Sequence, residues 1–297
     1  QFDRSNEVCG ISRSYQHREY ENCTRKRRGI SDLTPGYYLR IMKKPTILIT
    51  NDDGIHAPGL RYLIETMRPL GNIVVIAPDK PQSAMGHAVT IQSPLRIHTI
   101  TKSASYSEYS CNGTPADCVK LGEKVILRGK PNLIVSGINH GSNASINILY
   151  SGTMAAVIEG AMENVPAIGF SLNDYTHNAD FSHCGKIITS LAAQVLDNGL
   201  PDGICLNVNI PAMNGSPISG IRVTRQAKAF WKENFDERID PHQRDYYWLQ
   251  GEFVTTDTND DNDYWAINNN YVSVVPVQID LTAHHMISEI KNWKLEF

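Results

Sequence analysis

The chain has 297 residues, of which 41% are hydrophobic and 20% are charged, and its formal net charge is −3. These proportions are ordinary for a globular protein, and the length supports one large domain, alone or with an appendage. The slightly acidic balance argues against a dedicated nucleic-acid binder, and no apolar run is long enough to span a bilayer, so neither a nucleic acid nor a membrane is an expected partner.

The first 44 residues differ in character from the rest of the chain. They are polar, they lack periodicity, and they include the basic run Arg25-Lys26-Arg27-Arg28. We interpret residues 1–44 as a disordered or artefactual extension, with a nucleic-acid-binding arm as the functional alternative. The segment lacks the apolar core of a secretory signal, and the six cysteines show no zinc spacing, so we expect a cytoplasmic protein with reduced thiols.

Residues 45–297 open with a strand, a helix and a second strand. The short apolar run 47–49 is followed by the stretch 60–67, in which hydrophobic residues recur at helical spacing. The run 73–77 then has the pattern of a second buried strand. This order predicts a βαβ unit with a right-handed crossover.

The same alternation continues through most of the chain. Further strands are predicted at 133–135, 167–170 and 204–210, and helices at 114–127, 154–162 and 187–196. The runs 89–91, 95–100 and 106–111 are predicted to be strands of an excursion from the core. The last ninety or so residues contain one clear strand at 271–275 and a predicted helix at 285–293. The sequence therefore predicts an α/β fold: a Rossmann-like, mostly parallel sheet with helices on both faces and a smaller C-terminal β-rich appendage, which begins at about residue 225.

Three of the predicted strands end in polar loops. Asp52 and Asp53 follow the first strand, Ser83 lies in the loop after the second, and Asn139 follows the strand at 133–135. Ligands of open α/β sheets collect at the carboxyl ends of the strands, so these side chains are expected to meet at one edge. All four offer hard oxygen atoms, which suit Mg²⁺ or Mn²⁺. An ordinary Asn-Asp-Asp-Gly surface turn is the alternative for the acidic pair.

A fourth polar element, Ser151-Gly152-Thr153, precedes the predicted helix at 154–162. Free backbone N–H groups, two hydroxyls and the positive end of a helix dipole make such a segment a candidate anion site. The alternative is that Ser151 serves only as a helix cap. A metal beside an anion site points to metal-assisted phosphoester hydrolysis. His87 and His140 lie in the same loops and are weaker candidates for substrate contact.

These residues carry a resemblance to a known family. The run Asn51-Asp52-Asp53-Gly54-Ile55-His56-Ala57-Pro58-Gly59 resembles the signature of the SurE family, the survival-protein-E nucleotidases. Matching segments follow in chain order from about residue 45 to the C-terminus: 77–79 with Ser83, 112–115, 135–139 with Gly141 and Asn143, 150–153, 220–225 and 280–284. One departure is Ala84, where the family usually has glycine after the serine, and we expect it to stiffen the loop slightly and leave the ligand in place.

The resemblance implies a phosphatase that acts on nucleoside 5′-monophosphates, and often 3′-monophosphates, with one divalent cation per subunit. The family's metal ligands fall on Asp52, Asp53, Ser83 and Asn139. We expect Asp52 and Asp53 to act in catalysis through the metal, and the phosphate to be held by a second set: Asn143, Ser151, Gly152 and Thr153. The resemblance also implies a homodimer or homotetramer in which the C-terminal appendage exchanges between subunits.

Two other functions also place acidic residues after a first strand. A phosphatase that forms an aspartyl-phosphate needs two aspartates separated by one residue, whereas Asp52 and Asp53 are adjacent. A signalling receiver domain needs a phosphate-accepting aspartate after its third core strand, where this chain has Ser136 and Gly137. Both stay open as alternatives.

Overall fold

The computed structural model describes residues 44–176, 178–213 and 215–295. The predicted N-terminal extension therefore lies, apart from Lys44, outside the described residues. In the described part of the chain, no helix has the length and apolar character needed to cross a membrane. The strands are β1 (Thr46–Thr50), β2 (Asn72–Pro78), β3 (Ile97–Lys102), β4 (Tyr106–Cys111), β5 (Leu133–His140), β6 (Ala167–Asn173), β7 (Ile204–Pro211), β8 (Gly220–Val223), β9 (Ala229–Ile239), β10 (Asp245–Thr255) and β11 (Tyr271–Gln278).

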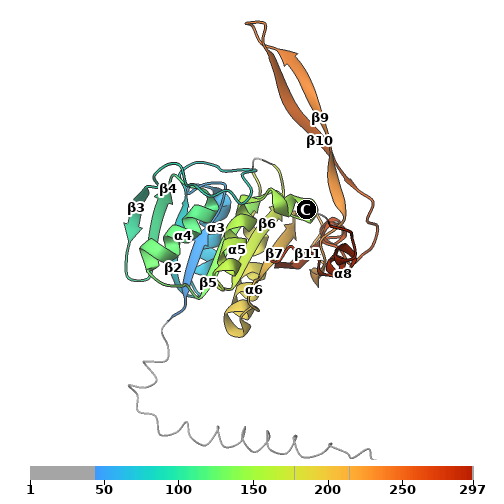
Figure 1. Ribbon diagram of the computed structural model, residues 1–297. Coiled ribbons are helices and arrows are strands. Elements are labelled where there is room, and N and C mark those ends of the chain that lie inside the picture. The colour runs from blue at the N-terminus through green and yellow to red at the C-terminus, as the bar shows by residue number, and fades with distance from the viewer. Residues whose placement is uncertain (1–43, 177, 214, 296–297) are drawn as a thin grey trace, which may run out of the picture. The chain divides into compact units, whose positions relative to one another are not determined.

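The helices connect these strands and cover the sheet on both sides (Figure 1). The α-helices are α3 (Pro58–Met67), α4 (Pro115–Leu121), α5 (Gly152–Met162), α6 (Gly185–Asn198), α7 (Asp263–Asn268) and α8 (Ile287–Lys291). Short helical turns of other types are η1 (Gly122–Leu127), η2 (Ser145–Leu149), η3 (Ser182–Cys184) and η4 (His284–Met286).

Nine strands form the central sheet, in the order β3-β4-β2-β1-β5-β6-β7-β11-β8. β1 pairs in parallel with both β2 and β5, so that Leu48 lies between Val74 and Ile134. Alternate residues of β1 enter two different hydrophobic cores, because neighbouring strand side chains point to opposite faces. Ile47 and Ile49 pack with α3 and α6, whereas Leu48 packs with α4 and α5. The predicted α/β fold with helices on both faces is confirmed.

The predicted N-terminus of α4 is also confirmed. Thr114 caps the helix through Asp117, whose side chain in turn accepts a hydrogen bond from the Thr114 backbone, and Pro115 occupies the first turn. The α-helix is shorter than the predicted 114–127, since a π-helical turn, η1, takes over at Gly122. A β-carbon at Gly122 would lie 2.8 Å from the end of the Leu48 side chain, so a larger residue there would displace Leu48 in the core.

The strand predicted at 89–91 is wrong. The backbone N–H of Thr90 donates to the carboxylate of Asp117, at 3.0 Å, and so satisfies its hydrogen bond without a strand partner. The next two strands were predicted to form an excursion from the core. They belong instead to the main sheet, because β4 pairs in parallel with β2 and antiparallel with β3.

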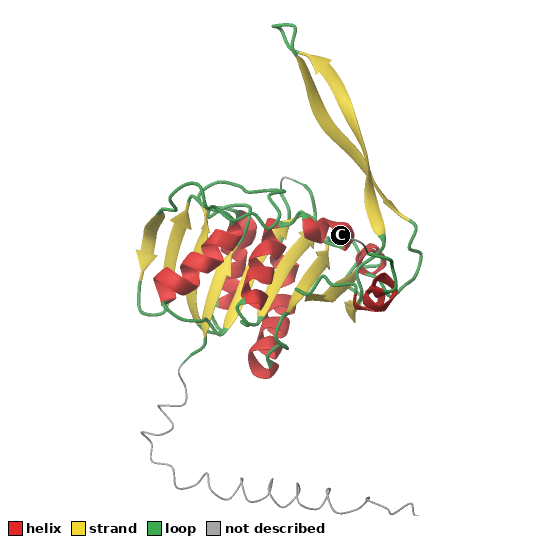
Figure 2. Cartoon of the chain, in the orientation of Figure 1, coloured by secondary structure: helices red, strands yellow, loops and turns green. Residues whose placement is uncertain are grey.

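The C-terminal region divides into two parts. β9 and β10 form a two-stranded antiparallel hairpin that is separate from the main sheet (Figure 2). The strand predicted at 271–275 is confirmed as β11, but it belongs to the main sheet, where it pairs antiparallel with β7 and parallel with β8. The predicted appendage is thus reduced to the hairpin.

Candidate active site

The acidic pair lies where β1 ends, at the carboxyl edge of the sheet. Asn51 closes the turn by donating from Nδ2 to the carbonyl of Gly54, at 3.0 Å. Gly54 has a φ of +98°, a conformation that residues with a β-carbon rarely adopt. The turn lets both carboxylates face one cavity of about 560 Å³, with Asp52 only 5% exposed.

Burial disfavours the ionised form of both carboxylates, and the charge of Asp53 adds to this effect at Asp52. Burial, and after it the negative charge of Asp53, raises the pKa of Asp52 to about 6. Burial also raises the pKa of Asp53, although the backbone N–H of His140, which donates to Asp53 Oδ2 at 3.3 Å, acts in the opposite direction. Each carboxylate therefore lies in a position where a cation would stabilise its ionised form.

Helix α5 supports Asp52 directly. Thr153 Oγ1 donates to Asp52 Oδ1 at 2.5 Å, and Thr153 is fully buried. A β-carbon at Gly152 would lie 2.7 Å from Cβ of Asp52, so a side chain there would displace the aspartate. The first turn of α5 thus fixes the position of the acidic pair.

Backbone hydrogen bonds hold the loop that carries Ser83 against the same edge. The N–H of Gln82 donates to the Asp52 carbonyl at 2.7 Å, and the N–H of Gly86 donates to the Tyr150 carbonyl at 3.1 Å. Ser83 and Ala84, which lie between these two anchored residues, line the cavity. Ala84 has a φ of +59°, in the left-handed region that favours glycine, which gives a physical reason why a glycine would suit this position.

Asn139 reaches the cavity because β5 extends beyond its predicted end. The strand runs through to His140, and its pairing with β6 shifts register between Ser136 and Asn139. Such irregularities re-aim side chains next to functional sites. The Asn139 side chain donates from Nδ2 to the Gly141 carbonyl at 2.7 Å, which leaves the amide oxygen as the atom available to a cation.

Most of the predicted site residues line one cavity. They are Asp52, Asp53, Ser83, Asn139, Asn143 and Ser151, together with His140. Gly152 and Thr153 lie behind this lining, in contact with Asp52. His87 lines another cavity, where its Nε2 lies 3.0 Å from Glu159 Oε2, so the structure does not bring it to the acidic pair.

Ser151 and Asn143 are both held by hydrogen bonds. Ser151 Oγ accepts from the N–H of Met154 at 3.0 Å and thus caps α5. The side chain of Asn143 donates to Ser171 Oγ at 2.8 Å, and its backbone N–H donates to Asn209 Oδ1 at 2.8 Å. The predicted cap is confirmed, whereas phosphate contact by either residue stays a prediction.

Comparison with known proteins decides the family. A family model described as "Survival protein SurE" matches residues 47–233. The chain belongs to the SurE family. The 5′-nucleotidase SurE of Flavobacterium psychrophilum is 56% identical over 255 residues, which cover 86% of this chain and 99% of that protein. The 5′-nucleotidase SurE of Christiangramia forsetii is 57% identical, over 85% of this chain and 98% of that protein.

A solved SurE structure shares the fold. The crystal structure of the SurE protein from Aquifex aeolicus is 41% identical in sequence and superimposes with a TM-score of 0.73. The match covers 83% of this chain and 98% of that one.

The donor atoms of this SurE chain fit a hard divalent cation. Two carboxylates, a hydroxyl and an amide oxygen face one cavity. The raised pKa of Asp52 reflects its burial and, after it, the neighbouring charge of Asp53, and a bound cation would offset both effects. Among the described residues, no three His, Cys, Asp or Glu side chains gather in a metal-binding arrangement. A cation at this edge would therefore depend on the serine and asparagine oxygens as well as on the two aspartates.

Sequence reasoning missed several residues of the SurE cavity. Tyr150 and Tyr175 line it from loops, and Trp231, Glu233 and Leu249 line it from the β9–β10 hairpin. For the three hairpin residues, the only indication in the sequence is the aromatic-rich composition of the C-terminal region. Their position depends on how the hairpin lies beside η2, where Trp231 donates to Asn147, and no local pattern specifies that placement.

Proposed function

We propose that the chain is a divalent-metal-dependent phosphatase that hydrolyses nucleoside 5′-monophosphates, and also 3′-monophosphates, to nucleoside and phosphate. The observation that carries the proposal is the cavity in which Asp52, Asp53, Ser83 and Asn139 present oxygen atoms beside the N-terminus of α5. Curated relatives more than 50% identical over most of this chain bear the name 5′-nucleotidase, which supports the same reaction and the 5′ position.

In this proposal, Asp52 and Asp53 hold one Mg²⁺ or Mn²⁺ ion, and Ser83 and Asn139 complete the protein ligands. A bound divalent cation supplies an activated water and offsets charge on the phosphoryl oxygens. Thr153 favours the ionised form of Asp52 by donating a hydrogen bond to it. The His140 N–H does the same for Asp53.

The substrate phosphate is assigned to the side of the cavity where α5 begins. As the helix cap, Ser151 uses its oxygen to accept a hydrogen bond, so its own O–H remains free to donate to a phosphate. The positive end of the helix dipole favours an anion here. Asn143 lines the same cavity, and Gly152 and Thr153 contribute through the backbone of the first turn.

The two alternatives predict a covalently phosphorylated protein. Incubation with acetyl phosphate and Mg²⁺, followed by mass spectrometry of the intact chain, distinguishes them from a hydrolase that uses water directly. We expect no added phosphate on the protein. A stable phosphorylated aspartate would favour an aspartyl-phosphate enzyme or a receiver domain.

The proposed activity is tested by a phosphate-release screen over nucleoside 5′- and 3′-monophosphates, each with Mn²⁺, with Mg²⁺ and with a chelator. We expect release that depends on the added cation. Undiminished release in the presence of the chelator would contradict the metal-dependent mechanism, and no release from any nucleotide would contradict the nucleotidase assignment.

We extend the proposal to assembly as a homodimer or homotetramer through the C-terminal appendage. The hairpin supports this, because both of its strands expose large apolar side chains: Phe230, Phe235, Ile239, Tyr247, Trp248 and Leu249. Exposed apolar surface of this kind is typical of an interaction surface. Light scattering of the whole chain, beside a variant in which Phe235 and Tyr247 are replaced by serine, should show a smaller assembly for the variant.

A further inference from the structure

Two aromatic rings stand at the part of the active-site cavity that is formed by the hairpin and the loop after β6. Tyr175 follows β6, and Trp231 lies on β9. Both rings line the cavity of the acidic pair, and both also line an adjoining cavity of about 320 Å³. The two rings therefore mark the boundary between the acidic edge and a second, aromatic compartment.

The ring of Tyr175 is held in place at one end. Its hydroxyl accepts a hydrogen bond from the N–H of Ser142 at 3.1 Å. The ring lies against Gly141, where a β-carbon would come within 2.6 Å of a ring carbon. Tyr175 is nevertheless 70% exposed, so much of its ring is available to another planar group.

Trp231 is fixed by both a hydrogen bond and ring packing. Its Nε1 donates to Asn147 Oδ1 at 2.8 Å, and its ring meets Phe253 edge to face at a centroid distance of 5.4 Å. Gly251 of the neighbouring strand, β10, lies beside the indole ring, and a β-carbon at this position would lie 3.2 Å from the ring. With 39% of the residue exposed, the indole is held firmly and still accessible.

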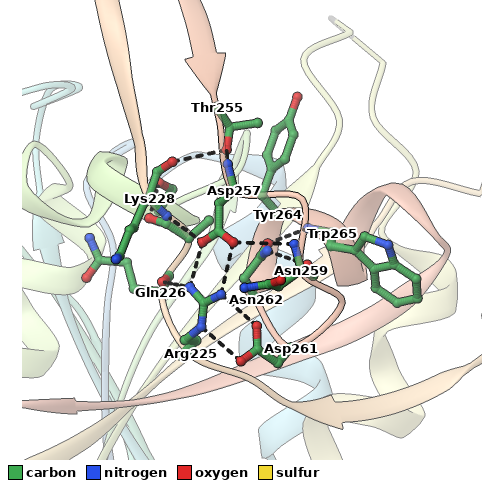
Figure 3. A network of polar contacts seen from close by, with 12 residues as sticks. Arg225, Gln226, Lys228, Thr255, Asp257, Asn259, Asp261, Asn262, Tyr264 and Trp265 are labelled. Carbon is green, nitrogen blue, oxygen red and sulfur yellow. Dashed lines mark hydrogen bonds and ion pairs between the residues drawn. The ribbon is translucent and has the colours of Figure 1, made fainter.

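A polar network fixes the base of the hairpin (Figure 3). Arg225 binds Asp257 through two nitrogens, at 2.6 and 2.9 Å, and Asp257 also accepts from the N–H of Lys228 at 3.0 Å. Thr255 Oγ1 donates to the Lys228 carbonyl at 3.1 Å. Because both ends of the hairpin are tied together, Trp231 is oriented before a ligand binds, which lowers the entropy cost of binding.

The register of the hairpin places Trp231 and Glu233 on the same face. Trp231 pairs with Phe253, and Glu233 pairs with Gly251, so these four share one face of the hairpin. Three of them, Trp231, Glu233 and Gly251, line the active-site cavity. Trp248, whose partner is Asp236, lies on the opposite face and does not line it.

We propose that Trp231 and Tyr175 bind the nucleobase of the substrate, while its phosphate lies at the Asp52/Asp53 edge. Planar aromatic rings stack on every base, since each base has a π-face. The adjoining compartment adds amide groups that can hydrogen-bond to the edge of a base, from Asn147, Asn173 and Asn268. This inference rests on the proposed nucleotidase function and names the part of the substrate that the hairpin recognises.

The test compares AMP with ribose 5-phosphate, which keeps the sugar and phosphate and lacks the base. In Trp231→Ala and Tyr175→Ala, we expect KM for AMP to rise about tenfold, within the range for loss of one base–aromatic stack. KM for ribose 5-phosphate should stay within twofold. Trp231→Phe and Tyr175→Phe retain a ring and should recover most of the loss. Tyr246→Ala, a matched aromatic substitution on the opposite face, where Tyr246 pairs with Arg238 and does not line the cavity, should behave as the wild type does.

Adenosine binding by calorimetry, without added metal, gives a readout that does not depend on hydrolysis. We expect binding to the wild type and at least fivefold weaker binding to both alanine variants. Equal effects on AMP and ribose 5-phosphate, or unchanged adenosine binding, would overturn the base-site assignment and leave the phosphatase reaction standing. Failure of the wild type to release phosphate from both compounds would instead overturn the proposed function.

Discussion

Thr153 donates a hydrogen bond to Asp52, at 2.5 Å, from the first turn of the helix that begins beside the cavity. The bond opposes the effects of burial and of Asp53, which together raise the pKa of Asp52. It links the acidic edge to the phosphate side of the proposed site, because the residue that supports Asp52 belongs to the same turn as Ser151 and Gly152. The two halves of the site are therefore built on one structural unit.

Replacing Thr153 by valine keeps the shape of the side chain and removes this hydrogen bond. A hydrogen bond to a charged group contributes about 1.5–3 kcal/mol, so Mn²⁺ affinity should fall about tenfold or more. The pKa of Asp52 should rise further, which makes the loss larger at pH 6 than at pH 7.5. Calorimetric titration with Mn²⁺ at both pH values measures this. Thr153→Ser, which keeps the hydroxyl, should bind nearly as the wild type does, and equal affinities of all three proteins would contradict the role of Thr153.

Gly152→Ala tests the contact between α5 and the acidic edge. The new β-carbon would lie 2.7 Å from Cβ of Asp52 and 3.0 Å from Oδ2, so the aspartate must shift. Helix propensity alone predicts the opposite sign, because alanine stabilises a helix by about 1 kcal/mol relative to glycine. We expect a lower melting temperature and weaker Mn²⁺ binding. Gly129→Ala, where the β-carbon meets nothing within 4 Å, is the control. A gain in stability without loss of Mn²⁺ affinity would show that Asp52 tolerates the added methyl group.

Ser151→Ala removes a helix cap and a proposed phosphate donor in one step. Loss of the cap should lower the free energy of unfolding by about 1 kcal/mol. Loss of a charge-assisted bond should weaken inorganic phosphate binding about tenfold, as measured by calorimetry in the presence of Mn²⁺. Thr114→Ala removes a cap of α4 and should affect stability alone. Phosphate affinity that stays at the wild-type value in Ser151→Ala would leave Ser151 with a structural role only.

The raised pKa of Asp52 predicts a pH-dependent stability in the absence of metal. The folded chain holds the Asp52 proton up to about pH 6, whereas the unfolded chain releases it near pH 3.8. The proton on Asp52 therefore stabilises the folded state fully below about pH 4. This contribution to stability is lost as the pH rises from about 4 to about 6. For a group this buried the loss is about 3 kcal/mol. Relative to Asp52→Asn, which does not titrate, the wild type should lose about this much in denaturant unfolding with a chelator present. A difference that does not change with pH would contradict the shifted pKa.

The sequence sufficed for those parts of the site that depend on local chemistry. A strand that ends in Asp52, Asp53 and Gly54 requires a turn, and parallel strands bring their carboxyl ends to one edge, so Ser83 and Asn139 could be assigned to the same cavity. Local pattern failed at Thr90, because the hydrogen bond from its N–H goes to Asp117, which lies far along the chain. Trp231 could not be placed either, since its position depends on Asn147 and on the hairpin network.

The most direct test of the account is the Mn²⁺ dependence of phosphate release from AMP by Asp53→Asn. The variant loses one of the two carboxylates assigned to the metal and should release phosphate at least a hundredfold more slowly than the wild type at limiting Mn²⁺. Its melting temperature in chelator should stay level or rise, because repulsion of Asp52 is relieved. Asp197→Asn, which removes an exposed carboxylate at the C-terminal end of α6, should release phosphate at the wild-type rate. Wild-type turnover by Asp53→Asn at limiting Mn²⁺ would contradict the assignment of the acidic pair as the metal site.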